Sequence, residues 1–249
     1  MNRSIFPLFI GILFAFCACS GRVSEDRGVY METEEAAAGY HEGLEVVLQP
    51  TSSFPDAMIE MYRPLGNEVF PEGKVEFEFN IKNYPFGSKR PFMLAINGTD
   101  GEEISYAVFS KNLGKGTYRA VAYLTDEQGL LLKEFGNYVD RDFRVGDSRA
   151  FPAADEPYLL LNRPRDGERI PVGEGLVVDF LVVWGDLKAD GLEAKLSVGD
   201  FEYRTQDQQV IRLTNLAKGE HVVRLDLLRK DGKELSNPFS SVSRRVLVE

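Results

Sequence analysis

The chain has few of the side chains on which most site chemistry depends. Its 249 residues include two cysteines, two histidines and one tryptophan, which leaves little material for a metal site or a histidine-assisted nucleophile. Positive charge is also scarce, because 29 Lys and Arg stand against 39 Asp and Glu, for a formal net charge of −10. Nucleic-acid binders neutralise phosphates with Lys and Arg. We therefore expect no nucleic-acid partner, no metal and no cofactor.

The N-terminus has a charged residue and then an apolar run that is too short to cross a membrane. Arg3 is followed by a largely apolar run over 5–16, whereas a spanning helix needs about 20 apolar residues. Such a pair of regions is typical of a secretory signal. The run closes on Phe16-Cys17-Ala18-Cys19, which resembles the signal of bacterial lipoproteins. Ala18 and Cys19 fit that pattern, while Phe16 and Cys17 depart from it.

This resemblance implies that residues 1–18 are a signal peptide and that Cys19 is lipidated. Two or more acyl chains anchor a protein stably, so we expect a lipid-anchored protein of the cell envelope, held at the outer membrane. The alternative is a plain secretory signal that leaves Cys19 as a free thiol, which is uncommon in an oxidising compartment.

Residues 19–56 are predicted to be a flexible acidic tether. The segment contains Ser24-Glu25-Asp26 and Glu32-Thr33-Glu34-Glu35, and its apolar residues follow no sustained period. Glu25-Asp26 also resembles the acidic surface-export signal that some lineages place after the lipidated cysteine. A solvated linker explains the same residues, and both interpretations stay open.

The most informative feature is an internal repeat. Motifs recur in the same order, spaced by 100 residues early in the repeat and by 103 residues later. The matched motifs are Arg63-Pro64 with Arg163-Pro164, Pro71-Glu72-Gly73 with Pro171-Val172-Gly173, and Leu113-Gly114-Lys115-Gly116 with Leu216-Ala217-Lys218-Gly219. We therefore predict two homologous domains, 57–147 and 157–249, joined by a linker over 148–156.

Within each repeat the apolar residues have a period of two. Val75, Phe77 and Phe79, for example, alternate with polar residues, as in half-buried antiparallel strands. Asn97-Gly98 is a hairpin-turn dipeptide. No stretch longer than ten residues shows a helical period. The prediction is an all-β chain with two tandem immunoglobulin-like antiparallel β-sandwiches.

The repeats resemble the immunoglobulin-like or fibronectin-III-like modules of bacterial envelope proteins. The opening Arg-Pro strand and the late hairpin around 116–124 and 219–227 carry this resemblance. It implies that Tyr118 is a corner tyrosine that hydrogen-bonds to the backbone, with His221 at the matching position of the second repeat.

Candidate chemistry is sparse. Asp186, Asp190 and Asp200 could offer oxygen ligands to calcium, although two of them lie in ordinary turn dipeptides, so the calcium question stays open. A glycosidase needs two carboxylates, yet the strand carboxylates fall on the polar phase of their strands, where we expect solvated faces. These are Glu76, Glu78, Asp179 and Asp226. We predict no catalytic residue and no enzyme.

Aromatic side chains are the remaining candidates for binding. Exposed rings bury large areas against a partner, and Trp184, Tyr84 and Tyr106 are the residues we select. The alternative is that they line the cores or the domain junction. We predict a non-enzymatic, lipid-anchored envelope protein that binds or scaffolds a protein partner. A glycan-binding accessory lipoprotein for polysaccharide capture is the alternative function.

Overall fold

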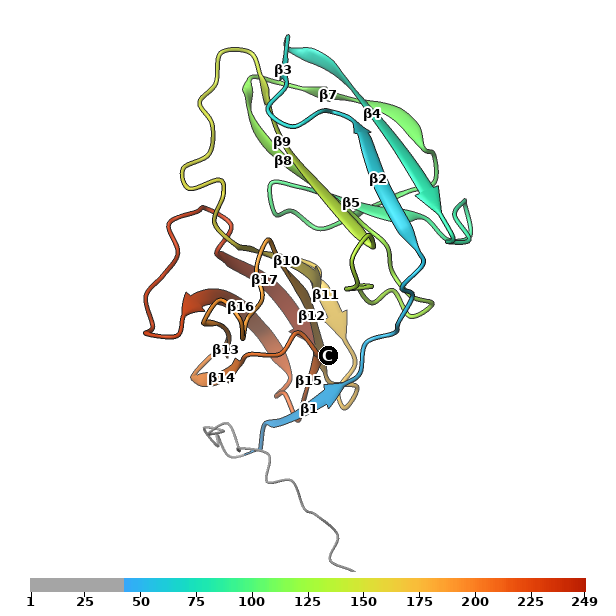
Figure 1. Cartoon of the computed structure of the whole chain (residues 1–249). Helices are drawn as coiled ribbons and strands as arrows, with labels where there is room; N and C mark the ends of the chain where they lie inside the picture. Colours follow the sequence, from blue (N-terminus) through green and yellow to red (C-terminus); the bar gives the residue numbers. More distant parts are fainter. Residues whose placement is uncertain (1–42) are drawn as a thin grey trace, which may run out of the picture. The chain divides into compact units, whose positions relative to one another are not determined.

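The regular secondary structure of the described residues consists of β-strands (Figure 1). The structure is a computed structural model that describes residues 43–249, and in this range it has strands and turns but no helix. The all-β prediction is therefore confirmed. The predicted signal peptide, Cys19 and the tether up to residue 42 lie outside the described residues. Within residues 43–249, no helix is long and apolar enough to span a bilayer.

The first sandwich consists of a three-stranded sheet, in the order β2-β4-β7, and a five-stranded sheet, in the order β3-β9-β8-β5-β6. Its strands are β2 (Met58–Arg63), β3 (Val69–Phe70), β4 (Gly73–Lys82), β5 (Phe92–Ile96), β6 (Glu102–Ile104), β7 (Val108–Leu113), β8 (Gly116–Tyr123) and β9 (Tyr138–Val145).

The second sandwich has sheets in the orders β1-β15-β12-β10 and β11-β17-β16-β13-β14. Its strands are β10 (Tyr158–Arg163), β11 (Glu168–Ile170), β12 (Leu176–Val183), β13 (Leu192–Val198), β14 (Phe201–Thr205), β15 (Val210–Thr214), β16 (Gly219–Arg229) and β17 (Ser241–Val248), joined by β1 (Glu45–Gln49) from the N-terminal side.

The two sandwiches share one topology. Apart from β1, every strand of the second has a counterpart of the same rank and the same sheet neighbours in the first. In both, the register of the opening strand shifts just before an Arg-Pro dipeptide with a cis peptide bond. The short strand that follows pairs in parallel with the last strand of its sandwich, β3 with β9 and β11 with β17. The chain is thus a tandem β-sandwich protein.

Alternating apolar side chains fill both cores, as the period of two predicts. Val75, Phe77 and Phe79 of β4 are buried with Phe143 of β9 in the first core. In the second core, alternate residues of β13 and β16 pack together. Each core closes the space between its two sheets.

The predicted corner residues make the predicted bonds. The Tyr118 hydroxyl donates to the Gly114 carbonyl oxygen at 2.9 Å, and His221 Nε2 lies 2.7 Å from the Ala217 carbonyl oxygen, which can only accept. Both side chains therefore fix the turn that precedes the long hairpin strand. The corner role of Tyr118 and its match at His221 are confirmed.

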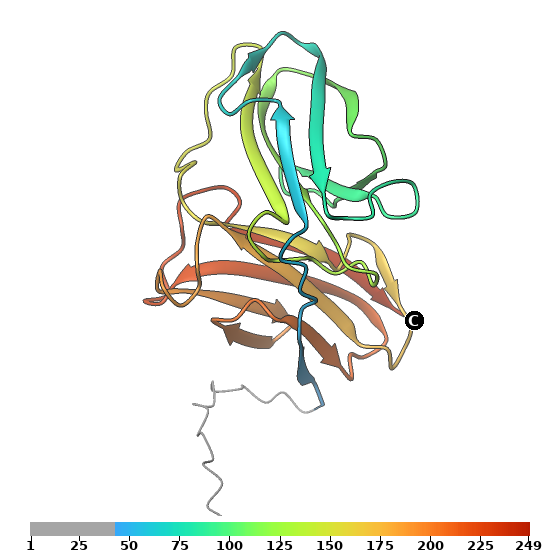
Figure 2. The same ribbon diagram turned by 45° about the vertical axis from the view of Figure 1, so that its right-hand side comes forward.

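The prediction that the whole of 19–56 is a flexible tether is wrong for its last part. Residues Glu45–Gln49 form β1, which pairs antiparallel with β15 from Glu45 opposite Thr214 to Gln49 opposite Val210. Val46 packs against the second core. After β1 the chain runs past the second sandwich and enters the first at β2 (Figure 1, Figure 2). The paired residues are 161 to 169 positions apart in the sequence, so this pairing leaves no local sequence signal.

A third apolar cluster joins the two sandwiches, which belong to one compact unit. Its buried members come from the outer faces of β5 and β8, from the following loop, and from β10 and β12; they are Met93, Ala95, Val121, Tyr123, Leu131, Tyr158, Leu160, Leu181 and Val183. Polar contacts surround this cluster. Arg244 Nε lies 2.6 Å from Asp100 Oδ1, and the Tyr123 hydroxyl donates to Asn162 Oδ1 at 3.1 Å.

This junction corrects the expectation that the strand carboxylates are solvated. Asp179 on β12 is fully buried, where it accepts a hydrogen bond from the Leu131 amide at 2.7 Å and pairs with Lys133 at 2.9 Å. Asp226 is also buried, and Arg224 and Ser241 both donate to its carboxylate. The polar phase of a strand faces solvent only when no second layer covers it. Here the first sandwich covers Asp179.

Candidate functional site

The backbone of Trp184 has a conformation that a bulky side chain rarely adopts. Its φ is +63°, in the left-handed region that costs L-residues about 1–2 kcal/mol and is commonly left to Gly or Asn. The registers define the equivalent residue in the first sandwich. Lys82 pairs with Met58, the first residue of β2, and Val183 pairs with Tyr158, the first residue of β10. Lys82 and Val183 are therefore equivalent, and so are the residues that follow them, Asn83 and Trp184. Asn83 has φ +53°.

The fold therefore requires a left-handed residue at this position, and the first sandwich uses a residue type that tolerates it. Tryptophan in the second sandwich is not explained by core packing, because 54% of its surface is exposed. Strained conformations of this kind persist where the surrounding structure holds them, and they cluster at functional sites. Trp184 is the starting point of the candidate site.

A buried carboxylate fixes the Trp184 ring. The indole Nε1 donates to Asp140 Oδ1 at 3.0 Å, which joins the second sandwich to β9 of the first. Burial raises the pKa of Asp140, and the hydrogen bond from Trp184 and the charge of Arg119 partly oppose that rise. A half-exposed ring with its only polar atom bound in this way is held in one orientation.

Arg119 lies beneath the Trp184 ring, on the side of the junction between the two sandwiches. Its guanidinium is buried and forms two hydrogen bonds of 2.7 Å with the carboxylate of Asp142, the strong bidentate geometry for an arginine. Aromatic rings from the second sandwich surround the cation, with the Tyr158 centroid at 4.1 Å and that of Trp184 at 5.8 Å. These are cation–π distances. The junction beneath Trp184 is thus a packed, charged cluster.

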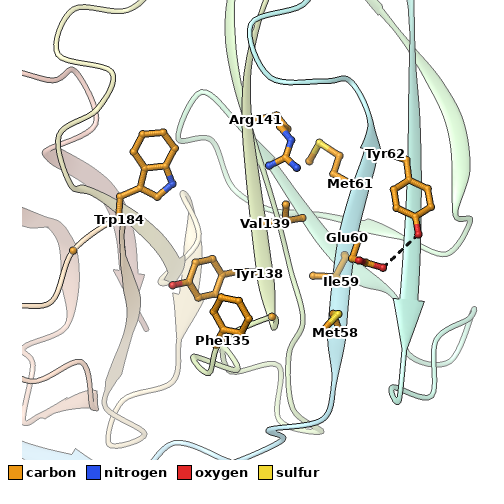
Figure 3. Close-up of a pocket in the computed structure, with 12 residues that line it drawn as sticks. Met58, Ile59, Glu60, Met61, Tyr62, Phe135, Tyr138, Val139, Arg141 and Trp184 are labelled. Atoms are coloured by element: carbon orange, nitrogen blue, oxygen red, sulfur yellow. Dashed lines mark hydrogen bonds between the residues drawn. The ribbon is translucent and has the colours of Figure 1, made fainter.

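Beside Trp184 lies a groove of about 620 Å³ between β2 and β9. Figure 3 shows the Trp184 indole on one side, β2 on the other, and Tyr138, Val139 and Arg141 of β9 between them. The other lining residues come from β2, from the turn before β9 and from the residue after Trp184; they are Met58, Ile59, Glu60, Met61, Tyr62, Phe135, Gly136 and Gly185. The lining is mostly aliphatic, thioether and aromatic, which suits an apolar ligand group.

Phe135 stands at the rim of this groove with 93% of its surface exposed. The turn that carries it is pinned at both ends. The Glu134 amide donates to Asn137 Oδ1 and the Asn137 amide donates to the Glu134 carbonyl oxygen, both at 3.0 Å. Buried Asn137 also donates to the Ala57 carbonyl oxygen at 2.7 Å. The ring is therefore presented to solvent by a fixed turn.

Two charged side chains line the groove, and they differ in their partners. The Glu60 carboxylate accepts hydrogen bonds from Lys82 at 3.0 Å and from Asn80 at 2.8 Å. Arg141 donates from Nη1 to the carbonyl oxygen of Asp140 at 2.7 Å, and it has no carboxylate partner among the described residues. The groove is apolar with one cation that a ligand could neutralise.

The structure separates the three residues predicted to bind a partner. Trp184 lines the groove. Tyr106 is 75% exposed but lies between β6 and β7, outside the groove. Tyr84 is only 8% exposed, and its hydroxyl donates to the Thr125 carbonyl oxygen at 3.1 Å. The expectation that Tyr84 belongs to an exposed binding surface is wrong, because the ring packs in the first core.

Sequence reasoning did not select Phe135, Arg141 and Met61 as binding residues. The sequence does contain a signal for the exposure of Phe135, because Gly136-Asn137 indicates a turn and Phe135 directly precedes it. Arg141 and Met61 had none. Their shared groove arises from two strands that are far apart in sequence.

Two of the three candidate calcium ligands, Asp186 and Asp190, accept hydrogen bonds from backbone amides of their own turn. Asp186 Oδ1 accepts from the Lys188 and Ala189 amides at 2.9 and 2.7 Å, and Asp190 Oδ2 accepts from the Asp186 amide at 2.8 Å. Across residues 43–249, no group of three His, Cys, Asp or Glu is arranged to hold a metal ion. Of the other strand carboxylates, Glu76 and Glu78 both lie 3.8 Å from Arg63.

No family model matches the chain, and neither does any curated protein. Solved structures that resemble it are tandem domains. The fibronectin(III)-like modules of CbhA from Clostridium thermocellum are 14% identical, with 77% of this chain and 94% of that chain covered and a TM-score of 0.30.

Two further structures resemble the chain at lower identity. The three N-terminal domains of the outer capsid protein Hoc of bacteriophage RB49 are 8% identical, with 78% and 70% of the two chains covered and a TM-score of 0.25. Domains 4 and 5 of the S-layer protein SbsC are 9% identical, with 79% and 99% covered and a TM-score of 0.21. The β-sandwich fold of this chain follows from the strands and sheet orders described above.

Proposed function

We propose that this protein is a binding module that docks a protein partner in the groove between β2, β9 and Trp184. The observation that carries the proposal is Trp184 itself. Its equivalent, Asn83, meets the same backbone demand with a tolerant residue, so neither the backbone at position 184 nor the filling of a core calls for tryptophan. A rigid, half-exposed tryptophan is the kind of residue that supplies binding energy at protein interfaces.

Phe135 supports the same conclusion. A phenylalanine on a pinned turn loses little conformational entropy when a partner covers it, because its backbone is already ordered. Phe135 and Trp184 both border the groove, so a partner could bury two aromatic anchors at once. Apolar side chains gathered in this way on a surface mark interaction sites.

The groove favours a protein partner over a glycan. Sugar rings stack on tryptophan, and Trp184 is the observation that favours the glycan alternative. Sugars also require a dense set of hydrogen-bonding side chains, whereas most of this lining is apolar and its polar groups outside Glu60 are two tyrosine hydroxyls and Arg141. The Glu60 carboxylate is already bound to Lys82 and Asn80.

The binding role we propose is not catalytic. A catalytic site in the groove would need an acid, base or nucleophile poised for the reaction. Glu60 is the carboxylate that lines it, and Lys82 neutralises that group. Arg141 does not give up its proton at ordinary pH.

We further propose that the module is held to the cell envelope, at the outer membrane, by lipid on Cys19. The supporting observation is the sequence Phe16-Cys17-Ala18-Cys19 after a short apolar run. Substitution Cys19→Ala should move the protein from the membrane fraction to the soluble fraction. Unchanged membrane partition would refute the anchor, and Cys17→Ala is the matched control that should keep it.

Photo-crosslinking in intact cells tests the docking site. A photoreactive phenylalanine analogue in place of Phe135 should give a discrete crosslinked protein band. The same analogue at Tyr106, which is also highly exposed but outside the groove, should not give that band. Trp184→Ala should reduce the Phe135 crosslink severalfold. Equal crosslinking from both positions, or none from Phe135, would contradict the proposal.

A further inference from the structure

We infer that the groove recognises the carboxyl terminus of a peptide whose last residue has a large apolar side chain. This inference rests on the proposed function and names the part of the partner that binds. It follows from the two properties that the groove combines: an apolar lining, and one cation without a carboxylate partner.

The apolar half of the groove suits one large side chain. Met58 and Val139 lie on facing strands, and Trp184 and Phe135 form the rim. Met61 closes the floor from the first core, since it is only 3% exposed. A volume of about 620 Å³ accommodates an aromatic or branched aliphatic side chain with part of its backbone, which is within the usual range for ligand pockets. A partly exposed methionine such as Met58 adapts to ligands of different shape.

The charged half of the groove suits one carboxylate. Arg141 lies between β2 and the Trp184 side of the groove, next to Met61 (Figure 3). One nitrogen of its guanidinium is engaged by the Asp140 carbonyl oxygen, so the other donors remain for a ligand. Arginine binds carboxylates through two parallel hydrogen bonds, and in a mostly apolar setting such bonds are stronger than in water.

A C-terminal residue can fill both the apolar and the charged part of the groove by itself. Its side chain and its α-carboxylate leave the same Cα, so one residue brings a carboxylate to Arg141 and an apolar group to the neighbouring apolar lining. In an internal acidic residue the carboxylate is the side chain itself, so the apolar group would have to come from a different residue.

The single tryptophan gives a direct test. Because Trp184 is the only tryptophan in the chain, its fluorescence in the full-length protein reports on the groove alone. The probe is an N-acetylated peptide of three glycines, leucine and a terminal phenylalanine, titrated as the free acid and as the C-terminal amide. We expect a saturable change with the acid and an affinity about tenfold weaker with the amide, the usual effect of losing one charge-assisted contact.

Matched variants separate recognition from folding. Arg141→Gln should weaken binding of the acid about tenfold and abolish the preference over the amide, whereas Arg141→Lys should retain part of it. Arg149→Gln removes a positive charge from an exposed residue outside the groove and should bind like the unchanged protein. Thermal melts confirm that each variant is folded.

Several outcomes would overturn the inference. These are equal affinity for acid and amide, no saturable change with either peptide, or dodecanoate binding as tightly as the acid, which would indicate a fatty-acid site. If the peptides fail while the Phe135 crosslink persists, the docking proposal stands and the carboxyl-terminal inference falls. If both fail, the groove is not the docking site.

Discussion

Position 184 carries different side chains in two sandwiches that share one backbone conformation there. The two sandwiches place equivalent residues, Asn83 and Trp184, in the same left-handed conformation, so the first sandwich is an internal control for the second. Because the backbone conformation is the same at both positions, it does not explain why one of them carries a tryptophan side chain. Asp140 then fixes that side chain through the indole nitrogen.

Replacing Trp184 should therefore cost little stability. We expect Trp184→Asn to change the free energy of unfolding by less than about 1 kcal/mol, because relief of the left-handed strain offsets the lost contacts. A core tryptophan, by contrast, costs about 3–5 kcal/mol when truncated. Trp184→Val is the matched comparison. Its β-branched side chain fits this conformation poorly, so it should be about 1–2 kcal/mol less stable than the Asn variant in urea unfolding.

Trp184 fluorescence should also follow the protonation of Asp140. Burial disfavours the carboxylate and raises the pKa of Asp140 above its ordinary value of 3.8, so the proton binds at a higher pH than for an exposed aspartate. As the pH falls from neutral, the indole loses an anionic acceptor. We expect the emission to change with a midpoint above 3.8 and to be flat in this range for Asp140→Asn. A midpoint at or below the ordinary value, or the same titration in the variant, would contradict this assignment.

At the scale of elements, β1 connects the two sandwiches through the chain itself. It covers the edge of β15, which would otherwise be an unpaired strand edge open to other chains. Residues just after β1 then contact the first sandwich, where the Ser52 hydroxyl donates to Asp126 Oδ2 at 2.7 Å. The segment acts as a strap from the edge of one sandwich to a loop of the other.

Alternate residues of β1 allow a controlled test of this strap. Val46 packs against the second core, whereas Val47 is exposed. Val46→Asp should detach β1 and raise hydrogen exchange in β15 about tenfold or more, since a partly buried charge costs at least a kcal/mol. Val47→Asp should leave that exchange unchanged. Equal effects from the two variants would show that the pairing does not depend on the packing of Val46.

The limits of sequence reasoning are visible in the same elements. Alternating apolar residues such as Phe77 and Phe79 predicted the strands and the cores, because that signal is local. The partner strand of β1 and the burial of Asp179 both depend on segments brought together by the tertiary fold. The groove has the same origin, which is why Trp184 could be selected from the sequence but Arg141 could not.

At the scale of the whole molecule, the proposed groove depends on a fixed junction between the two sandwiches. Apolar packing around Tyr123 and Tyr158 is surrounded by charged contacts, of which Lys133 with Asp179 and Arg244 with Asp100 join one sandwich to the other. Removing one member of the buried Lys133–Asp179 pair leaves an uncompensated charge, so this contact favours one arrangement of the two sandwiches. The groove needs that arrangement, because Trp184 belongs to one sandwich and Arg141 to the other.

The most direct test of this claim is the distribution of distances between the two sandwiches in solution. Residues 43–249 contain no cysteine, so Lys74→Cys and Lys218→Cys, both at exposed positions, can be spin-labelled selectively once Cys17 and Cys19 are replaced by Ala. Pulsed electron–electron double resonance should give one narrow distance distribution, and Asp179→Ala with Asp100→Ala should broaden it. A broad distribution in the unchanged junction would contradict a groove assembled from both sandwiches.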